Sequence, residues 1–183
     1  GIAFPRGALD SMSHIRLLAP DGAEQSLQAA SQARWPDGSV KWALLSFRAD
    51  VPMSNTAAYV FEYGSKVKPA SPRNKVTVDE SSATVVVSTG PLRLVLDRKS
   101  FALPGQVWLD KNGDSLFSDD ELLCGVKPGV GTLADTAGTA FTTLGTPDDV
   151  SVEERGPERA VILVKGHHVA QGGSKSFAFE ARL

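Results

Sequence analysis

The chain has 183 residues, enough for one large domain or two small ones with a real core. Its 19 basic and 21 acidic residues are mixed along the chain, so there is no basic stripe of the kind that binds nucleic acid. No apolar run approaches the roughly 18 residues that span a bilayer. A single cysteine, Cys124, excludes an intramolecular disulfide and a multi-cysteine zinc site.

The first strong structural signal is a hairpin around the sequence WPDGSVKW. Apolar and polar residues alternate over 27–35, which predicts a half-buried strand. Pro-Asp-Gly then favours a tight turn, because proline presets φ, aspartate bonds its own backbone and glycine accepts positive φ. The return run over 40–49 has apolar residues on both parities, which predicts a strand covered on both faces.

Short runs typical of strands continue to the end of the chain. Their ranges are 58–63, 75–78, 84–88, 93–97, 106–109, 150–154, 159–166 and 177–183. Many short strands between turn residues predict an all-β fold, either an antiparallel β-barrel or a β-sandwich. The one helical candidate is 119–124, and the Gly-, Thr- and Ala-rich segment 125–146 predicts one long irregular excursion.

The organisation of the chain points to one β-rich domain over 1–183. The segment KPASPRNK at 68–75 is the best linker candidate and marks an alternative boundary within it. The sequence ends on FAFEARL, which is typical of a strand without a closing turn. We therefore expect an N-terminal fragment of a larger multidomain protein.

The most specific chemical pattern is the acidic segment that starts at residue 110. An EF-hand loop takes calcium ligands from positions 1, 3, 5, 7, 9 and 12. Counted from residue 110, these positions hold Asp110, Asn112, Asp114, Leu116 (through its carbonyl), Ser118 and Glu121. Such oxygen donors suit calcium, and the pattern predicts an EF-hand-like calcium loop.

Two features separate this loop from an ordinary EF-hand. Position 6, normally glycine, is Ser115, and the preceding QVWL is typical of a strand where an EF-hand has a helix. A solvated acidic turn without an ion is the alternative interpretation. A loop that fills its own coordination sphere leaves no position for substrate, so we expect a structural rather than a catalytic calcium.

Other chemistry-bearing patterns are sparse. The sequence contains no GxSxG, HExxH, Walker or Rossmann pattern. Tryptophan rings on β-surfaces can stack on sugars, so Trp35 and Trp108 are candidate carbohydrate contacts. The catalytic residues, if the chain has any, are not identified by these patterns.

Several segments in order resemble one known family. GIAFPRGAL, ARWPDGSVKWALLSF, TGPLRLVLD, DKNGDSLFSDDE and VEERGPERAVILVKGHH together are similar to the N-terminal β-domain of exo-rhamnogalacturonan lyase-like proteins, a polysaccharide lyase family. The resemblance implies a RIFT-type barrel that precedes a helical toroid-like domain in a secreted, multidomain protein acting on pectic polysaccharide. It also implies an extracellular or periplasmic location.

Three functions remain open from the sequence. The first is a non-catalytic accessory or structural β-domain of such a carbohydrate-active protein, with downstream domains of the same polypeptide as partners. The second is an edge of a polysaccharide lyase active site, and the third is a cell-surface interaction module. We expect no nucleic-acid partner.

Overall fold

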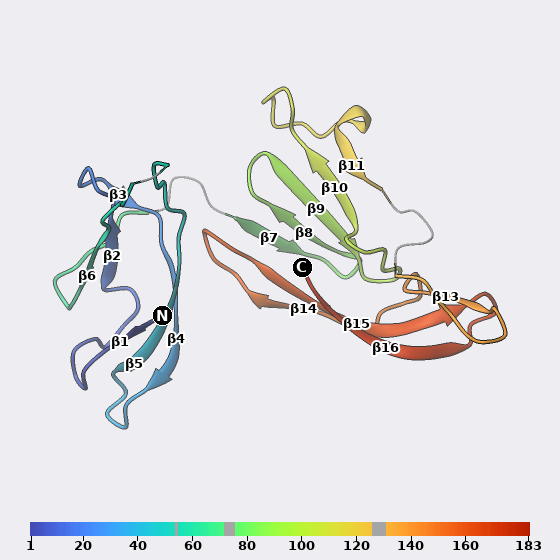
Figure 1. Ribbon diagram of the computed structural model, residues 1–183, viewed down its shortest axis with the longest axis horizontal. Helices are drawn as coiled ribbons and strands as arrows, with labels where there is room; N and C mark the ends of the chain where they lie inside the picture. Colours follow the sequence, from blue (N-terminus) through green and yellow to red (C-terminus); the bar gives the residue numbers. More distant parts are fainter. Residues whose placement is uncertain (54, 72–75, 126–130) are drawn as a thin grey trace. The chain divides into compact units, whose positions relative to one another are not determined.

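The computed structural model describes residues 1–53, 55–71, 76–125 and 131–183. Its strands are β1 (Ile2–Ala3), β2 (Ile15–Leu18), β3 (Glu24–Gln25), β4 (Gln28–Arg34), β5 (Val40–Ser46), β6 (Val60–Tyr63), β7 (Thr77–Glu80), β8 (Thr84–Ser88), β9 (Leu92–Asp97), β10 (Gln106–Leu109), β11 (Leu122–Cys124), β12 (Leu133–Ala134), β13 (Ala140–Thr142), β14 (Asp149–Glu154), β15 (Val161–Ala170) and β16 (Lys175–Arg182) (Figure 1). In the described residues the one helical element is a 3-10 turn, η1 (Asp119–Glu121). The predicted all-β class is confirmed.

The chain divides into two compact units. Unit 1 comprises Gly1–Lys75 with Gly156–Arg159, and unit 2 comprises Val76–Arg155 with Ala160–Leu183. The structure thus has two units where one domain was expected. The change between them comes directly after the segment 68–75 that was predicted as a linker.

Unit 1 is built from two three-stranded antiparallel sheets. Their strand orders are β1-β5-β4 and β3-β2-β6. Buried Phe4, Leu9, Ile15, Val40 and Ala43 form the core, so both sheets contribute to it. Each fully buried aliphatic or aromatic side chain stabilises the fold by about 1.5–3 kcal/mol relative to exposure.

The hairpin turn of unit 1 follows its sequence signature. The Trp35 N–H donates to the Ser39 carbonyl (2.8 Å), and Gly38 has a φ of 86° that glycine adopts without steric cost. Asp37 Oδ1 accepts hydrogen bonds from the Ser39 N–H (3.0 Å) and hydroxyl (2.7 Å). The predicted Pro-Asp-Gly turn is therefore confirmed.

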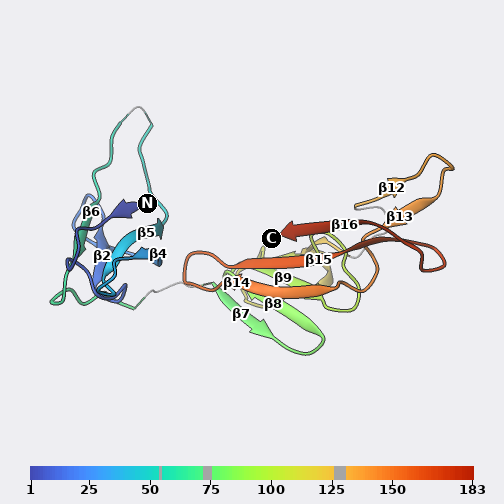
Figure 2. The same ribbon diagram turned by 90° about the horizontal axis from the view of Figure 1, so that it is seen from below.

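Unit 2 is a sandwich of two antiparallel sheets. One has the order β11-β10-β9-β8-β7, and the other has the order β12-β13-β15-β14 with β16 also paired to β15. Figure 2 shows β14, β15 and β16 lying alongside one another in the second sheet.

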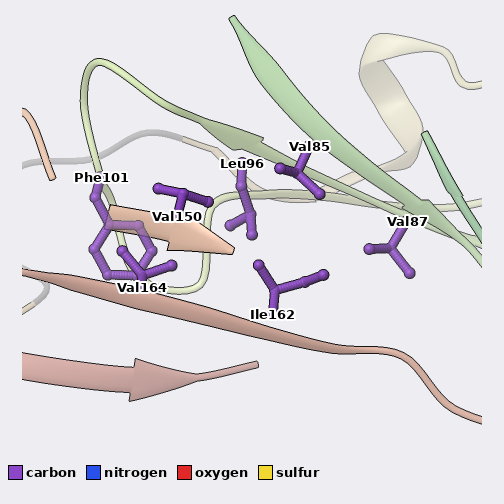
Figure 3. Packing of buried hydrophobic residues seen from close by; sticks show 7 residues of the cluster. All are labelled: Val85, Val87, Leu96, Phe101, Val150, Ile162 and Val164. Atoms are coloured by element: carbon purple, nitrogen blue, oxygen red, sulfur yellow. The ribbon is translucent and has the colours of Figure 1, made fainter. Parts of the chain in front are cut away.

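The core of unit 2 lies between its sheets. Val85, Val87 and Leu96 point from the first sheet toward Ile162 and Val164 of the second (Figure 3). All five are buried, with at most 8% of their surface exposed. Because side chains alternate along a strand, the intervening side chains of β8 and β9 point away from this core.

Most predicted strands are present with shifted ends. The ranges 84–88 and 106–109 match β8 and β10, whereas β15 runs four residues beyond the predicted end at 166. The helical prediction over 119–124 is wrong in its second half, because Leu122–Cys124 pairs with β10 as β11. Pairing with a neighbouring strand outweighs the weak local preference of ELLC for helix.

Two further expectations differ from the structure. The predicted excursion over 125–146 contains the hairpin β12–β13 in its described part, while residues 126–130 lie outside the described residues. The return strand of the first hairpin is not covered on both faces, since Trp42 is 45% and Leu44 38% exposed. An apolar run on both parities therefore does not establish two-sided burial here.

Candidate functional site

The acidic loop connects two neighbouring strands of the first sheet of unit 2. β10 ends at Leu109, and the chain returns through η1 into β11 (Figure 1). Trp108 lies opposite Leu122 across the two strands. The Asp110 N–H donates to the Pro91 carbonyl (2.7 Å), which fixes the start of the loop against the β8–β9 connection.

The first half of the loop is held by its own side chains. Asp110 accepts hydrogen bonds from the N–H groups of Gly113 (2.7 Å) and Ser115 (2.9 Å). Asn112 Oδ1 accepts from the Asp114 N–H (2.9 Å), and Asp114 Oδ1 accepts from the Leu116 N–H (2.8 Å). Three predicted ligand side chains thus shape the loop by bonding backbone two to five residues ahead.

Ser115 has the left-handed backbone that the spacing anticipates at position 6. Its φ is 62°, in the region where a Cβ costs on the order of 1 kcal/mol. The departure from glycine therefore does not prevent the chain from turning as an EF-hand loop does at this position. It makes the turn strained.

Glu121 is the most buried charged group of the loop. Its residue is 2% exposed. Oε1 accepts from the Lys111 N–H (2.9 Å), and Oε2 accepts from the Ser118 N–H (3.2 Å) and hydroxyl (3.0 Å). The Lys111 N–H, and after it the Ser118 N–H, hold the pKa of this carboxyl below its usual range. The carboxylate closes the loop by bonding both its beginning and its end.

The structure does not gather the predicted calcium ligands into one ready site. Within residues 1–53, 55–71, 76–125 and 131–183, no group of three or more His, Cys, Asp and Glu side chains could hold a metal ion. Asp114 is exposed and Asp110 is half-buried, whereas Glu121 is turned toward backbone donors. The residues bring the right donor chemistry to one loop, but Glu121 must reorient to join an ion.

Trp108 lies beside this loop and contacts a cation. The Arg93 guanidinium carbon is 6.0 Å from the centroid of the Trp108 ring and 5.6 Å from that of Phe117. Arg93 and Trp108 are cross-strand partners of β9 and β10. Phe117, at position 8 of the acidic loop, therefore contacts the same guanidinium as Trp108.

Trp35, the other candidate carbohydrate contact, is engaged within unit 1. Its indole N–H donates to the Phe4 carbonyl (3.1 Å), and the Lys41 ammonium lies 4.6 Å from its ring centroid. These contacts fix the ring in the hairpin. Trp35 belongs to unit 1 and Trp108 to unit 2.

Arg93 is the residue of this region that the sequence patterns did not single out. TGPLRLVLD shows one cation among apolar residues of a strand, which is a signal of an outward position. Only the pairing of β9 with β10 reveals that its neighbour is a tryptophan.

Comparison with protein families finds two consecutive matches. Residues 1–62 match the model described as PcRGLX-like N-terminal RIFT barrel domain, and residues 76–183 match that described as PcRGLX-like protein central beta sandwich domain. Among curated proteins no match is found. The matched segments correspond to the two units except for Gly156–Arg159, which belong to unit 1 but fall in the second match, and the predicted linker 68–75 falls between the matches.

Proposed function

Because the chain belongs to the PcRGLX-like family, we propose that it is a non-catalytic accessory region of a rhamnogalacturonan lyase-like, carbohydrate-active protein. One observation carries the proposal: two consecutive family β-domains account for both compact units. The proposal extends to an extracellular or periplasmic location, pectic polysaccharide as a ligand and downstream domains of the same polypeptide as partners. No helix in the described part of the chain has the length and apolarity to cross a membrane.

The acidic loop is proposed to bind a structural calcium ion. Support comes from six oxygen donors at EF-hand spacing, Asp110, Asn112, Asp114, Leu116, Ser118 and Glu121, and from the left-handed turn at position 6. The segment 110–121 carries five acidic residues and one lysine, so its formal charge is −4. A divalent cation would lower that repulsion.

Calcium binding would change the role of Glu121. In the structure its two oxygens serve Lys111 and Ser118, and each carboxylate oxygen has more than one lone pair. Reorientation of the side chain would direct one or both oxygens to the ion. Because the ligands come from one short connection between β10 and β11, the ion would stabilise that connection rather than activate a substrate.

The accessory function is tested by comparing binding with turnover. The 183-residue protein would be incubated with rhamnogalacturonan oligosaccharides, and unsaturated products followed by ultraviolet absorbance. Retention on immobilised rhamnogalacturonan would be measured in parallel. We expect retention without product formation.

The other outcomes are informative. Product formation by the purified chain would contradict a non-catalytic role and favour a lyase site at its edge. Absence of retention and of product, together with a protein partner recovered by cross-linking, would favour an interaction module. A variant with Trp108→Ala reports whether retention involves the surface of unit 2.

A further inference from the structure

The outer face of the first sheet of unit 2 carries a row of side chains that does not belong to the core. In register across the sheet, this row consists of Leu122, Trp108, Arg93, Ser88 and Thr77. Its neighbours along β9 on the opposite parity are Leu94 and Leu96, which pack in the core. The row therefore lies on the surface that faces away from the second sheet.

Arg93 is the cation at the centre of this row. Ring contacts with Trp108 and Phe117 hold its guanidinium. In the described residues, its recorded side-chain contacts are with these two rings, and no carboxylate or carbonyl oxygen accepts a hydrogen bond from it. A guanidinium donates its hydrogen bonds in its own plane, so contacts with ring faces leave this donor fork unused.

A small pocket adjoins the row. Its volume is about 120 Å³, and it is lined by Val95, Asp97, Ser100, Ala102, Gly105 and Gln106. Val95 and Gln106 each lie two residues along their strands from Arg93 and Trp108, which places them about 6.6–6.8 Å away on the same face. That separation is comparable to the width of one sugar ring.

The lining of the pocket includes a turn that needs glycine. Gly105 has a φ of 106°, and a Cβ there would lie 2.7 Å from the Val95 carbonyl oxygen. Asp97 Oδ1 already accepts the Lys99 N–H (2.7 Å), and Ser100 donates its hydroxyl to the Leu144 carbonyl (3.1 Å). The amide of Gln106, another lining residue, supplies both a donor and an acceptor.

We propose that this face binds a sugar carrying a carboxylate, a uronate residue. Arg93 would bind the carboxylate through its donor fork, because a planar guanidinium matches a carboxylate bidentately. Trp108 would contact the apolar face of the pyranose ring, and Gln106 would hydrogen-bond its hydroxyl groups. The negative charge of Asp97 in the pocket repels another anion there, so the carboxylate of the uronate is directed to Arg93. The inference rests on the proposed carbohydrate-active function and names its ligand class.

The experiment compares two probes that differ at their carboxyl groups, which are charged in one and neutral methyl esters in the other. Calorimetric titrations would use trigalacturonic acid and its fully methyl-esterified form. The wild-type protein is expected to bind the acid about tenfold to a hundredfold more tightly than the ester, the range typical of a charge-assisted hydrogen-bond pair. Added salt should weaken binding of the acid and leave binding of the ester nearly unchanged.

Variants test which residue causes the tighter binding of the acid. Arg93→Gln should remove the preference for the acid, and Arg93→Lys should retain part of it, because lysine keeps the charge but lacks the fork. Lys165→Gln, which removes one positive charge from the second sheet, should keep the full preference. Melting temperatures of all variants show whether Arg93→Gln remains folded, and Arg93→Lys tests the site if it does not.

Equal binding of acid and ester by the wild type, or an unchanged preference in both Arg93 variants, would overturn the inference. Failure of both probes to bind would overturn it as well. The proposed accessory function is decided separately by retention on rhamnogalacturonan. Retention that is insensitive to Arg93→Gln would leave that function intact while excluding this uronate site.

Discussion

The hairpin turn at 35–39 and the acidic loop at 110–121 both use aspartate side chains to hold backbone N–H groups, but they compensate the charge differently. Asp37 has Arg6 as an ion-pair partner at 2.8 Å. In the described residues no Lys or Arg side chain forms a direct ion pair with a carboxylate of the loop, and the Lys111 ammonium donates to the Asp120 carbonyl instead.

This difference shows what separates a structural aspartate turn from a candidate cation site. In the hairpin, the negative charge is compensated by a cation of the same unit, and the turn is complete. In the loop, hydrogen bonds already hold the backbone in its turn conformation, but the net negative charge is not compensated by an ion pair within the described part of the chain. We therefore expect calcium to act on the loop and not on the hairpin.

The largest expected effect is on calcium affinity. Glu121→Gln keeps the size of the side chain but removes the charge and one carboxylate oxygen from position 12. We expect calcium affinity to fall roughly tenfold or more, and the calcium-dependent rise in melting temperature to shrink accordingly. Calorimetry and thermal unfolding with and without calcium measure both quantities.

Asp37→Asn is the matched control for that experiment. It removes a carboxylate from the hairpin turn, where no ion is expected, so its calcium affinity should equal that of the wild type. A Glu121→Gln protein with unchanged calcium response would contradict the proposed ligand set.

The next effect is on stability and compares two left-handed residues. Gly38→Ala adds a Cβ at φ 86°, and should lower the free energy of unfolding by about 1 kcal/mol. Ser115→Gly removes a Cβ at φ 62° and should raise it by roughly 0.5–1 kcal/mol, because the relieved strain exceeds the entropy lost by glycine. Denaturant unfolding measures both changes, and opposite signs are the decisive feature. Two losses of equal size would show that position 115 is not strained.

Features that neighbouring residues determine could be predicted from the sequence, whereas very short strands and the register between strands could not. The turn at Pro36–Gly38 and the strand 84–88 were predictable from local chemistry, as were the spacing and left-handed turn of the loop. β1 and β12 have two residues each and too little pattern to detect. The partnership of Arg93 with Trp108 depends on register between strands, which no local pattern specifies.

The smallest predicted effect is the pH dependence of the hairpin. Hydrogen bonds from the Ser39 hydroxyl first, and then from Arg6, lower the pKa of Asp37 from 3.8 to about 2. A carboxyl whose pKa is lowered in the folded state stabilises the fold at pH values above its ordinary pKa of 3.8. This contribution is lost as the pH falls through about 2. The melting-temperature difference between wild type and Asp37→Asn should therefore be constant above about pH 5 and shrink toward pH 2. A difference that stays constant to pH 2 would contradict this assignment.

The contrast between the two turns is tested most directly by a calcium titration followed by amide NMR. The chelator-treated 183-residue protein would receive calcium up to millimolar concentration while the N–H signals of 35–39 and 110–121 are monitored. We predict saturable shifts that fit one ion per chain, concentrated in 110–121 and absent from 35–39. No shifts in the loop at millimolar calcium, or equal shifts in both turns, would contradict the account.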